Sequence, residues 1–255
     1  QELDEQIGQL APGQVTVVAA RAKVGKTHAA IQLTGHITGQ RWPHLGDRPA
    51  GVLVASLEMD AASVYDRLLA WESGEDYAAL MRVGKASGSD AMETARKRVV
   101  EKGIYFLDRS GLTSGAIATA ARTLARRSPV DVLVVDYLDL VKPTGHARER
   151  HDLQVGAIVR DLLSLGRELE AHVVLLVQIN REGEQEATVR HLANSDEIAR
   201  AAHNILILNP NRSGDPLGVR RPIGTASHIS RLRIDVTSRG PGTGSRVPIQ
   251  LDKRT

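Results

Sequence analysis

Short runs dominated by branched aliphatic residues are the feature of this sequence that most constrains its fold. The runs are Val15–Ala20, Gly51–Ser56, Val132–Asp136 and His172–Gln178, with Ile104–Leu107 and Asn204–Leu208 as further candidates. A strand with one face in water alternates apolar and polar residues, whereas a strand covered on both faces is apolar nearly throughout. These runs therefore predict a parallel sheet that is buried between two layers of helices.

Longer stretches with helical character separate the apolar runs. They are Lys26–Thr38, Ala61–Trp71, Asp90–Lys102, Thr113–Arg127 and Arg150–Glu170. In the last stretch the spacing is close to 3.6 residues, which predicts one buried helix face. That face would hold Leu153, Ile158, Leu162, Leu165 and Leu169. The alternation of strands and helices predicts an α/β fold with a mostly parallel, twisted sheet and right-handed crossovers.

The C-terminal part has a different pattern. Ile229–Val236 and Arg246–Leu251 are strand-like and flank the Gly- and Pro-containing segment Thr237–Ser245, which predicts a β-hairpin over residues 229–252. Asn209–Thr225 is rich in Gly, Pro and Arg, and we expect it to form a mobile loop. We expect a single domain over residues 1–255, with residues 1–12 as its lead-in.

Composition excludes several functional classes. The 255 residues contain no cysteine, which rules out disulfide bonds and thiolate metal sites. No apolar run approaches the roughly 20 residues that span a bilayer, so we expect a cytoplasmic protein without membrane partners. A net charge of +3, with six arginines between residues 220 and 246, fits either nucleic-acid binding or a solvated basic surface. The chain begins at Gln1 rather than at a methionine, which is compatible with a piece of a longer protein.

The stretch after the first apolar run has the order of a phosphate-binding loop. Backbone amides at a helix N-terminus form a cavity for phosphates, a lysine reaches the outer phosphates, and a Ser or Thr hydroxyl binds Mg²⁺. The residues that would contact the nucleotide are Arg21, Ala22, Lys23, Val24, Gly25, Lys26, Thr27 and His28. Ala20 replaces the first glycine of the usual pattern, which requires a negative φ at that position. An ordinary α/β turn that happens to contain Gly-Lys-Thr is the alternative.

Polar side chains follow three other apolar runs. Asp136 ends one run, Glu58 lies just beyond another, and Gln178 ends a third. Ligands bind at the carboxyl ends of parallel strands, so these groups converge there with the phosphate loop. An acid at the position of Asp136 supports Mg²⁺ in P-loop enzymes, although many such residues only cap loops. Glu58 could polarise an attacking water or could simply favour a helix N-terminus.

Taken in order, these motifs resemble the RecA-like P-loop NTPase domain of DnaB-type replicative helicases, from about Glu2 to Asp252. The stretches that carry the resemblance are ELDEQIGQLAPGQVTVVAARAKVGKT, GVLVASLEM followed by YDRLLA, DVLVVDYLDL, VVLLVQINREGEQ and LRIDVTSRGPGTGSRVPIQLD. The resemblance implies a hexameric ring that hydrolyses ATP or another NTP with Mg²⁺ at subunit interfaces. Such a ring moves along single-stranded DNA, and primase or loader proteins are its further expected partners. The source would be a bacterium, a phage or a plasmid.

The resemblance also implies roles for the residues at the strand ends. Lys26 would contact the phosphates, and Thr27 and Asp136 would support the metal. Glu58 would orient or activate the attacking water. Gln178 would sense the γ-phosphate.

Two arginines would complete the site. The resemblance implies that Arg239 is a finger inserted into the neighbouring subunit's site, and that Arg67 is a secondary phosphate contact. The family's hairpin has a lysine two residues before the arginine, and Thr237 replaces it here. Arg233 or Arg246 could supply the missing positive charge.

Two loops would line the DNA channel by the same resemblance, namely Lys142–Arg150 and Arg181–Ser195. Their candidate DNA-binding residues are Lys142, Arg148, Arg150, Arg181 and Arg190. Neither loop contains an aromatic residue for base stacking, so we expect contacts to the phosphate backbone only. Merely solvated basic loops are the alternative.

Three functions remain compatible with these residues. The first is a ring-forming ATP-dependent DNA helicase or translocase. The second is a RecA-like ATPase with another task, such as a plasmid or phage helicase subgroup, a helicase loader or a recombination mediator. The third is a P-loop-derived scaffold with little hydrolysis, which the presence of both Glu58 and Asp136 disfavours. Ala199 and Ala202 weaken the family's acidic run after the second loop, which points to a divergent member.

Overall fold

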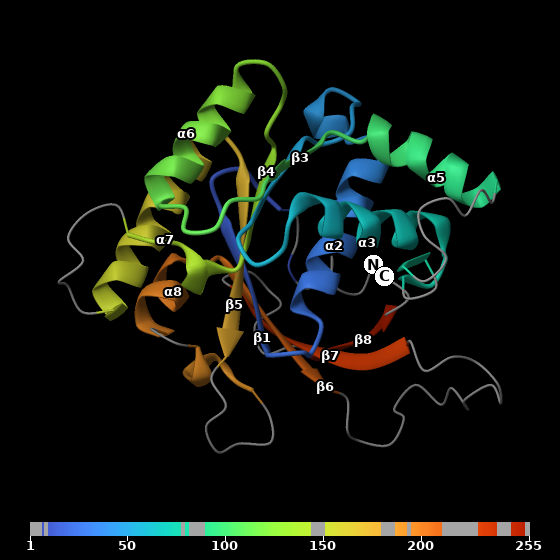
Figure 1. Cartoon of the computed structure of the whole chain (residues 1–255). Coiled ribbons are helices and arrows are strands. Elements are labelled where there is room, and N and C mark those ends of the chain that lie inside the picture. Colours follow the sequence, from blue (N-terminus) through green and yellow to red (C-terminus); the bar gives the residue numbers. More distant parts are fainter. Residues whose placement is uncertain are drawn as a thin grey trace.

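A computed structural model describes most of the chain. The described residues are 7, 10–77, 80–81, 90–143, 151–179, 187–192, 195–210, 229–238 and 246–252. They form one eight-stranded sheet flanked by helices (Figure 1). None of the described helices is long and apolar enough to cross a membrane.

The sheet has the strand order β3-β2-β4-β5-β1-β6-β7-β8. The strands are β1 (Val15–Arg21), β2 (Val52–Ser56), β3 (Ile104–Leu107), β4 (Val132–Asp136), β5 (His172–Ile179), β6 (Asn204–Pro210), β7 (Ile229–Ser238) and β8 (Arg246–Asp252). All pairings from β3 to β6 are parallel. β7 pairs antiparallel with β6 and with β8, so the predicted mostly parallel sheet with a C-terminal antiparallel pair is confirmed.

Helices cover both faces of this sheet. They are α2 (Lys26–Gly39), α3 (Ala61–Ser73), α5 (Asp90–Glu101), α6 (Ser114–Ala125), α7 (His151–Glu168) and α8 (Ser195–Ala201). In Figure 1, α2, α3 and α5 lie on one side of the strands, and α6, α7 and α8 lie on the other. Short 3-10 turns form η1 (Pro43–Leu45), η2 (Leu138–Leu140) and η3 (Val189–His191).

The central strand β1 shows why the apolar runs are continuous. Val15, Val17 and Ala19 belong to the core that also contains residues of α6, α7 and α8. Val18 and Ala20 belong to the core on the side of α2. Because successive side chains point to opposite faces, each face needs its own apolar set.

Two expectations from the sequence are wrong. Leu153 is 50% exposed, because at about 100° per residue it lies about 140° from the stripe that contains Ile158 and Leu162. Asn209 and Pro210 belong to β6 rather than to a loop. Asn209 is buried, and its side-chain amide donates to the carbonyl of Ala187 at 2.9 Å. The rest of that expected loop, residues 211–225, lies outside the described residues.

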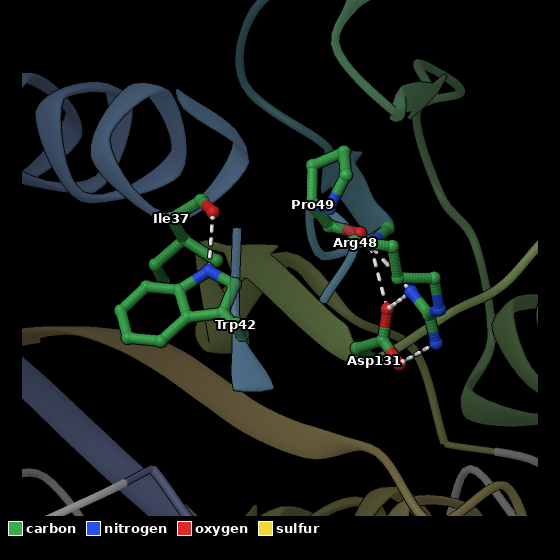
Figure 2. Close-up of polar contacts among 6 residues, drawn as sticks. Ile37, Trp42, Arg48, Pro49 and Asp131 are labelled. Atoms are coloured by element: carbon green, nitrogen blue, oxygen red, sulfur yellow. Dashed lines mark hydrogen bonds and ion pairs between the residues drawn. The ribbon is translucent and has the colours of Figure 1, made fainter. Parts of the chain in front are cut away.

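An ion pair between Arg48 and Asp131 lies at the amino end of β4 (Figure 2). Arg48 donates through both terminal nitrogens to the carboxylate of Asp131, at 2.7 and 2.8 Å, and the Gly51 amide donates to the same carboxylate at 2.7 Å. Burial raises the pKa of Asp131, but the hydrogen bonds from Arg48 and Gly51 outweigh burial and hold the pKa below its usual value. Nearby, the Trp42 indole donates to the Ile37 carbonyl at 2.8 Å. These contacts hold the segment between α2 and β2 against the start of β4.

Candidate functional site

The phosphate loop lies between β1 and α2, the arrangement that its sequence predicts. The Val24 amide donates to the Arg21 carbonyl at 3.3 Å, and α2 begins at Lys26 with Gly25 as its N-cap. No side chain caps this helix end, so its first amides have no side-chain acceptor and could bind a phosphate. Arg21 is half-buried at the end of β1, and Ala22 beyond it is exposed.

The structure explains how the loop tolerates alanine at position 20. Ala20 is a paired residue of β1 and is not among the residues with positive φ, so the predicted negative φ is confirmed. The left-handed conformations fall instead on Lys23, at φ 66°, and on Gly25, at φ 121°. Glycine is therefore required where the chain enters the helix and not where it leaves the strand.

Lys26 lies in a nearly closed environment of mixed charge. The residue is 9% exposed, and its ammonium lies 4.2 Å from the centroid of the Tyr137 ring. Burial lowers the pKa of Lys26 below its usual value. The negative charges of Asp136, Asp139 and Glu58, in that order, oppose this effect on the pKa, so all three carboxylates act electrostatically on the same ammonium.

Asp136 is the most buried acid of the site. It is 3% exposed at the end of β4, and burial raises its pKa above the usual value. The Thr27 hydroxyl donates a hydrogen bond to its carboxylate, and this bond and the positive charge of Lys26 act to lower the pKa. The Oδ1 atom is buried without a hydrogen-bond partner. One hydroxyl and one open carboxylate oxygen form a set of hard oxygen donors that fits Mg²⁺.

This donor set is small, as a magnesium site completed by phosphate oxygens requires. Within the described part of the chain, no group of three or more His, Cys, Asp or Glu side chains could hold a metal by itself. Thr27 and Asp136 are thus the residues that would hold Mg²⁺, together with a nucleotide.

Glu58 lies at the same edge and is exposed. Its charge raises the pKa of Asp136 and opposes the burial effect on Lys26, so the carboxylate lies close to both groups. It does not belong to the first turn of α3, which contains no acidic residue. Asp60 is the N-cap of that helix and accepts from the Ser63 amide at 2.6 Å. The helix-terminus interpretation of Glu58 is therefore wrong, because Asp60 fills that position.

Gln178 lies beside the beginning of the phosphate loop. In the β1–β5 pairing it is opposite Ala20. Its backbone amide donates to the Asp139 carboxylate at 3.4 Å, and its side chain is partly exposed. Four neighbouring strands, β2, β4, β5 and β1, thus bring the predicted polar groups to one edge of the sheet.

Arg67 is held by two rings next to α2. Its guanidinium Nη1 lies 3.2 Å from Nε2 of His28 in the first turn of α2. The guanidinium carbon lies 4.5 Å from the centroid of the Tyr77 ring. The structure therefore links Arg67 to the residue that follows Thr27.

Sequence reasoning missed two groups of the site, Tyr137 and Asp139. Both belong to the stretch DVLVVDYLDL, directly after the strand that ends at Asp136. Burial raises the pKa of Tyr137, and the negative charge of Glu58 adds to this. An aromatic ring next to a strand-terminal acid was the available signal, since the acid places it at the same edge.

The candidate DNA contacts and the trans arginine lie mostly outside the described part of the chain. Arg148, Arg150, Arg181 and Arg239 are not among the described residues, and only the backbone of Arg190 is described, in η3. Lys142 is exposed, and its backbone amide donates to the Leu112 carbonyl at 2.8 Å. Its side chain lies against Gly111 near the start of α6.

A parallel sheet of this order, with a phosphate loop at β1 and a buried acid at the end of β4, defines a RecA-like P-loop nucleotide-binding domain. Comparison with known proteins narrows this class. The family model of the DnaB-like helicase C-terminal domain matches residues 1–217, and the chain belongs to this family.

Two relatives illustrate the relationship. The replicative DNA helicase DnaB of Geobacillus stearothermophilus is 31% identical over 186 residues, which cover 72% of this chain and 39% of that protein. DnaB of Pasteurella multocida is 34% identical over 199 residues, which cover 76% of this chain and 40% of that protein. The match thus spans about two fifths of the length of these relatives.

Solved structures confirm the fold. A DnaB-like replicative helicase, described with its interactions with primase, superposes with a TM-score of 0.77 at 19% identity. It is matched over 98% of this chain and 57% of its own. A second solved structure, of an ATPase domain, gives a TM-score of 0.78 at 21% identity and covers 98% of this chain and 84% of that one.

Proposed function

We propose that this chain is the ATP-hydrolysing motor domain of a DNA helicase or translocase that works as a ring on single-stranded DNA. The observation that carries the proposal is the meeting of Lys26, Thr27 and Asp136 with the Glu58 carboxylate at one sheet edge. Membership of the DnaB-like family supports the same activity. The bound nucleotide would be ATP or another NTP, together with Mg²⁺.

The residues divide the work of phosphoryl transfer to water. Lys26 binds the outer phosphates with an ammonium that is already desolvated. Thr27 and Asp136 would hold Mg²⁺, which neutralises charge that develops on the phosphate oxygens when bound. Glu58 accepts the proton of the water that attacks the γ-phosphorus, while the bond to the β-bridging oxygen breaks and ADP leaves. Gln178 donates its amide to the γ-phosphate and so distinguishes ATP from ADP.

The remaining catalytic charge is proposed to come from a second subunit. Arg239 follows the last residue of β7, Ser238, in the sequence and lies outside the described residues. In this proposal it reaches the neighbouring site, and the assembly is a homo-oligomeric ring of six subunits. Thr237, in place of the family's lysine, is exposed. Arg246, at the start of β8, or Arg233, in β7, is proposed to supply the missing positive charge.

DNA would be held by the basic loops that follow β4 and β5. Lys142 is the described member, exposed beside the start of α6, and Arg148, Arg150, Arg181 and Arg190 complete the proposed set. Contacts to phosphates are independent of base sequence and weaken with salt. A primase or a loader is a further proposed partner, by analogy with the family.

The test is the ATPase rate measured together with particle size, with and without oligo(dT). We expect turnover per subunit to rise with protein concentration as rings form, to increase further with single-stranded DNA, and to lose the DNA effect at high salt. Equal turnover in dilute monomer, without stimulation by DNA, would contradict the proposal. Nucleotide-dependent assembly without any DNA effect would instead favour the alternative function, a helicase loader or recombination mediator.

A further inference from the structure

Tyr137 is an aromatic residue within the candidate site, and nothing described above assigns it a task. It follows Asp136 directly, and its ring centroid lies 4.2 Å from the ammonium of Lys26. Among the described residues, the Lys26 ammonium makes no hydrogen bond and no ion pair within 4.0 Å. The ring face of Tyr137 is therefore the side-chain contact that the structure shows for this ammonium.

The charges around Lys26 make this contact significant. Asp136, Asp139 and Glu58 all act on the lysine electrostatically. A flexible ammonium among three carboxylates would ordinarily collapse onto one of them, and a desolvated ion pair is costly to break. Such a pair with Glu58 would occupy both the phosphate-binding cation and the proposed base at once.

An aromatic face attracts a cation without forming a hydrogen bond. The three N–H donors of the ammonium therefore remain available to phosphate oxygens. Resting on the proposed function, we infer that Tyr137 is a positioning residue that holds the Lys26 ammonium away from the carboxylates until a nucleotide binds. The π face does this work, so the phenolic hydroxyl is dispensable for it.

Two substitutions separate the ring from the hydroxyl. Tyr137→Phe keeps the face, and Tyr137→Leu removes it while retaining an apolar side chain. We expect Tyr137→Leu to raise the Kd for a non-hydrolysable ATP analogue, and the KM for ATP, by about 3- to 30-fold, the range that a cation–π contact spans. The kcat should change much less, because binding lost equally in ground state and transition state appears in KM. Tyr137→Phe should stay within about 2-fold of wild type in both constants.

A matched control measures the effect of losing any aromatic ring from this sheet. Tyr105 lies in the edge strand β3 and packs against the core on the other face, and Tyr105→Leu should leave the nucleotide Kd unchanged. An equal rise of Kd in Tyr105→Leu, or an equal loss in Tyr137→Phe and Tyr137→Leu, would overturn the inference. A fall in kcat with an unchanged KM in Tyr137→Leu would overturn it as well.

A second readout needs no nucleotide. With the lysines carrying ¹³C-methyl labels, the Lys26 signal of the free protein should be shifted upfield by the ring current of Tyr137, and Lys26→Arg identifies that signal. The shift should persist in Tyr137→Phe and disappear in Tyr137→Leu. A Lys26 signal that is identical in all three proteins would refute the ring contact. Absence of nucleotide binding by wild type, with the shift present, would contradict the proposed function and leave the contact established.

Discussion

Glu58 differs from its neighbours at the site in being exposed, whereas Lys26 and Asp136 are buried. Its side chain contributes little to the packing of the fold, since it lies between the end of β2 and the Asp60 cap of α3. A substitution at Glu58 can therefore test catalysis without a large effect on folding.

We expect Glu58→Gln to lower the kcat for ATP by about 10²–10⁴-fold, the usual contribution of a general base. The Kd for the non-hydrolysable analogue should stay near that of wild type, because Lys26 and Thr27 remain. Steady-state kinetics and equilibrium binding measure the two effects. Glu101→Gln, an exposed carboxamide change on α5, is the control. A variant Glu58→Gln with wild-type turnover would remove Glu58 from the mechanism.

His172 lies at the opposite end of the sheet and affects stability rather than catalysis. It is 1% exposed, with Nδ1 2.8 Å from the Ala11 carbonyl oxygen and Nε2 2.9 Å from the Thr16 hydroxyl. Burial lowers the pKa of His172, the hydrogen bond to the Ala11 carbonyl raises it, and the charge of His203 lowers it, with a net value of about 4. The folded protein thus keeps this ring neutral where an unfolded chain, with a pKa of about 6.5, would protonate it.

Stability should therefore fall with acidification. Between pH 6.5 and about 4 the unfolded state binds the proton and the folded state does not, so this group lowers the free energy of unfolding by up to about 1.4 kcal/mol per pH unit. Above pH 6.5 the contribution is constant. In His172→Gln, urea denaturation at pH 7 and pH 5 should show a smaller difference than in wild type. The control is His36→Gln, which removes an exposed imidazole. If the free energy of unfolding changes between pH 7 and pH 5 by the same amount in His172→Gln as in this control, the assignment to His172 is refuted.

At the scale of elements, α2 and α3 pack so closely that a methyl group added at their contact should change the stability of the protein. Gly35 of α2 faces Trp71 of α3, and a Cβ at Gly35 would lie 2.3 Å from Cζ3 of the indole. The Lys102 ammonium donates to the Gly35 carbonyl at 3.1 Å, so the α5 end is tied to the same place. This packing fixes α2, and with it the amides of the phosphate loop.

Gly35→Ala should destabilise the protein, although alanine in a helix usually stabilises by about 1 kcal/mol relative to glycine. Overpacking against Trp71 costs about 1–3 kcal/mol, so we expect a net loss of about 1 kcal/mol in the free energy of unfolding by urea. Trp71→Leu in the same chain should relieve the clash. The double variant should therefore lose less free energy of unfolding than the sum of the losses in the two single variants. Gly39→Ala on the same helix meets only the end of the Lys102 side chain and should not destabilise. Stabilisation by Gly35→Ala would contradict the packing.

At the scale of the whole molecule, a single chain does not contain the complete site that we propose. The described part of the site provides the phosphate loop, the metal-supporting acid and the proposed base, and Arg239 would come from a neighbouring chain. An incomplete site explains why activity should depend on assembly.

Mixing two inactive variants tests this division. Lys26→Ala and Arg239→Ala should each lower hydrolysis by at least about 10²-fold, the effect of removing one charge-stabilising group. In a mixture, some interfaces pair an intact Lys26 with an intact Arg239, so we expect partial recovery, up to about a quarter of the wild-type rate when random interfaces act independently. Size analysis with one tagged variant establishes co-assembly. Co-assembled rings with no recovered activity would exclude Arg239 as the trans group.

The strands were predictable because their signal is local. Burial on both faces requires apolar residues at every position, so β1, β2, β4 and β5 are recognisable to within one or two residues. The convergence of Asp136 with the phosphate loop was predictable for a related reason, since parallel strands place their carboxyl ends at one edge. The error at Asn209 arose because residues distant in the sequence supply the hydrogen-bond partners that allow a polar side chain to be buried. Asn209 resembles a loop residue, but its amide also donates to Asp235 of β7 at 2.7 Å, which permits burial in β6.

The sequence by itself determined the buried strands, the phosphate loop and the identity of the polar groups at the strand ends, because each depends on residues close together in the chain. Only the tertiary structure decided the strand order and the contact of the Tyr137 ring with the Lys26 ammonium. These depend on pairings between distant segments, whose partners no local pattern specifies. Lys26 and Tyr137 are far apart in sequence and meet because β1 and β4 both flank β5.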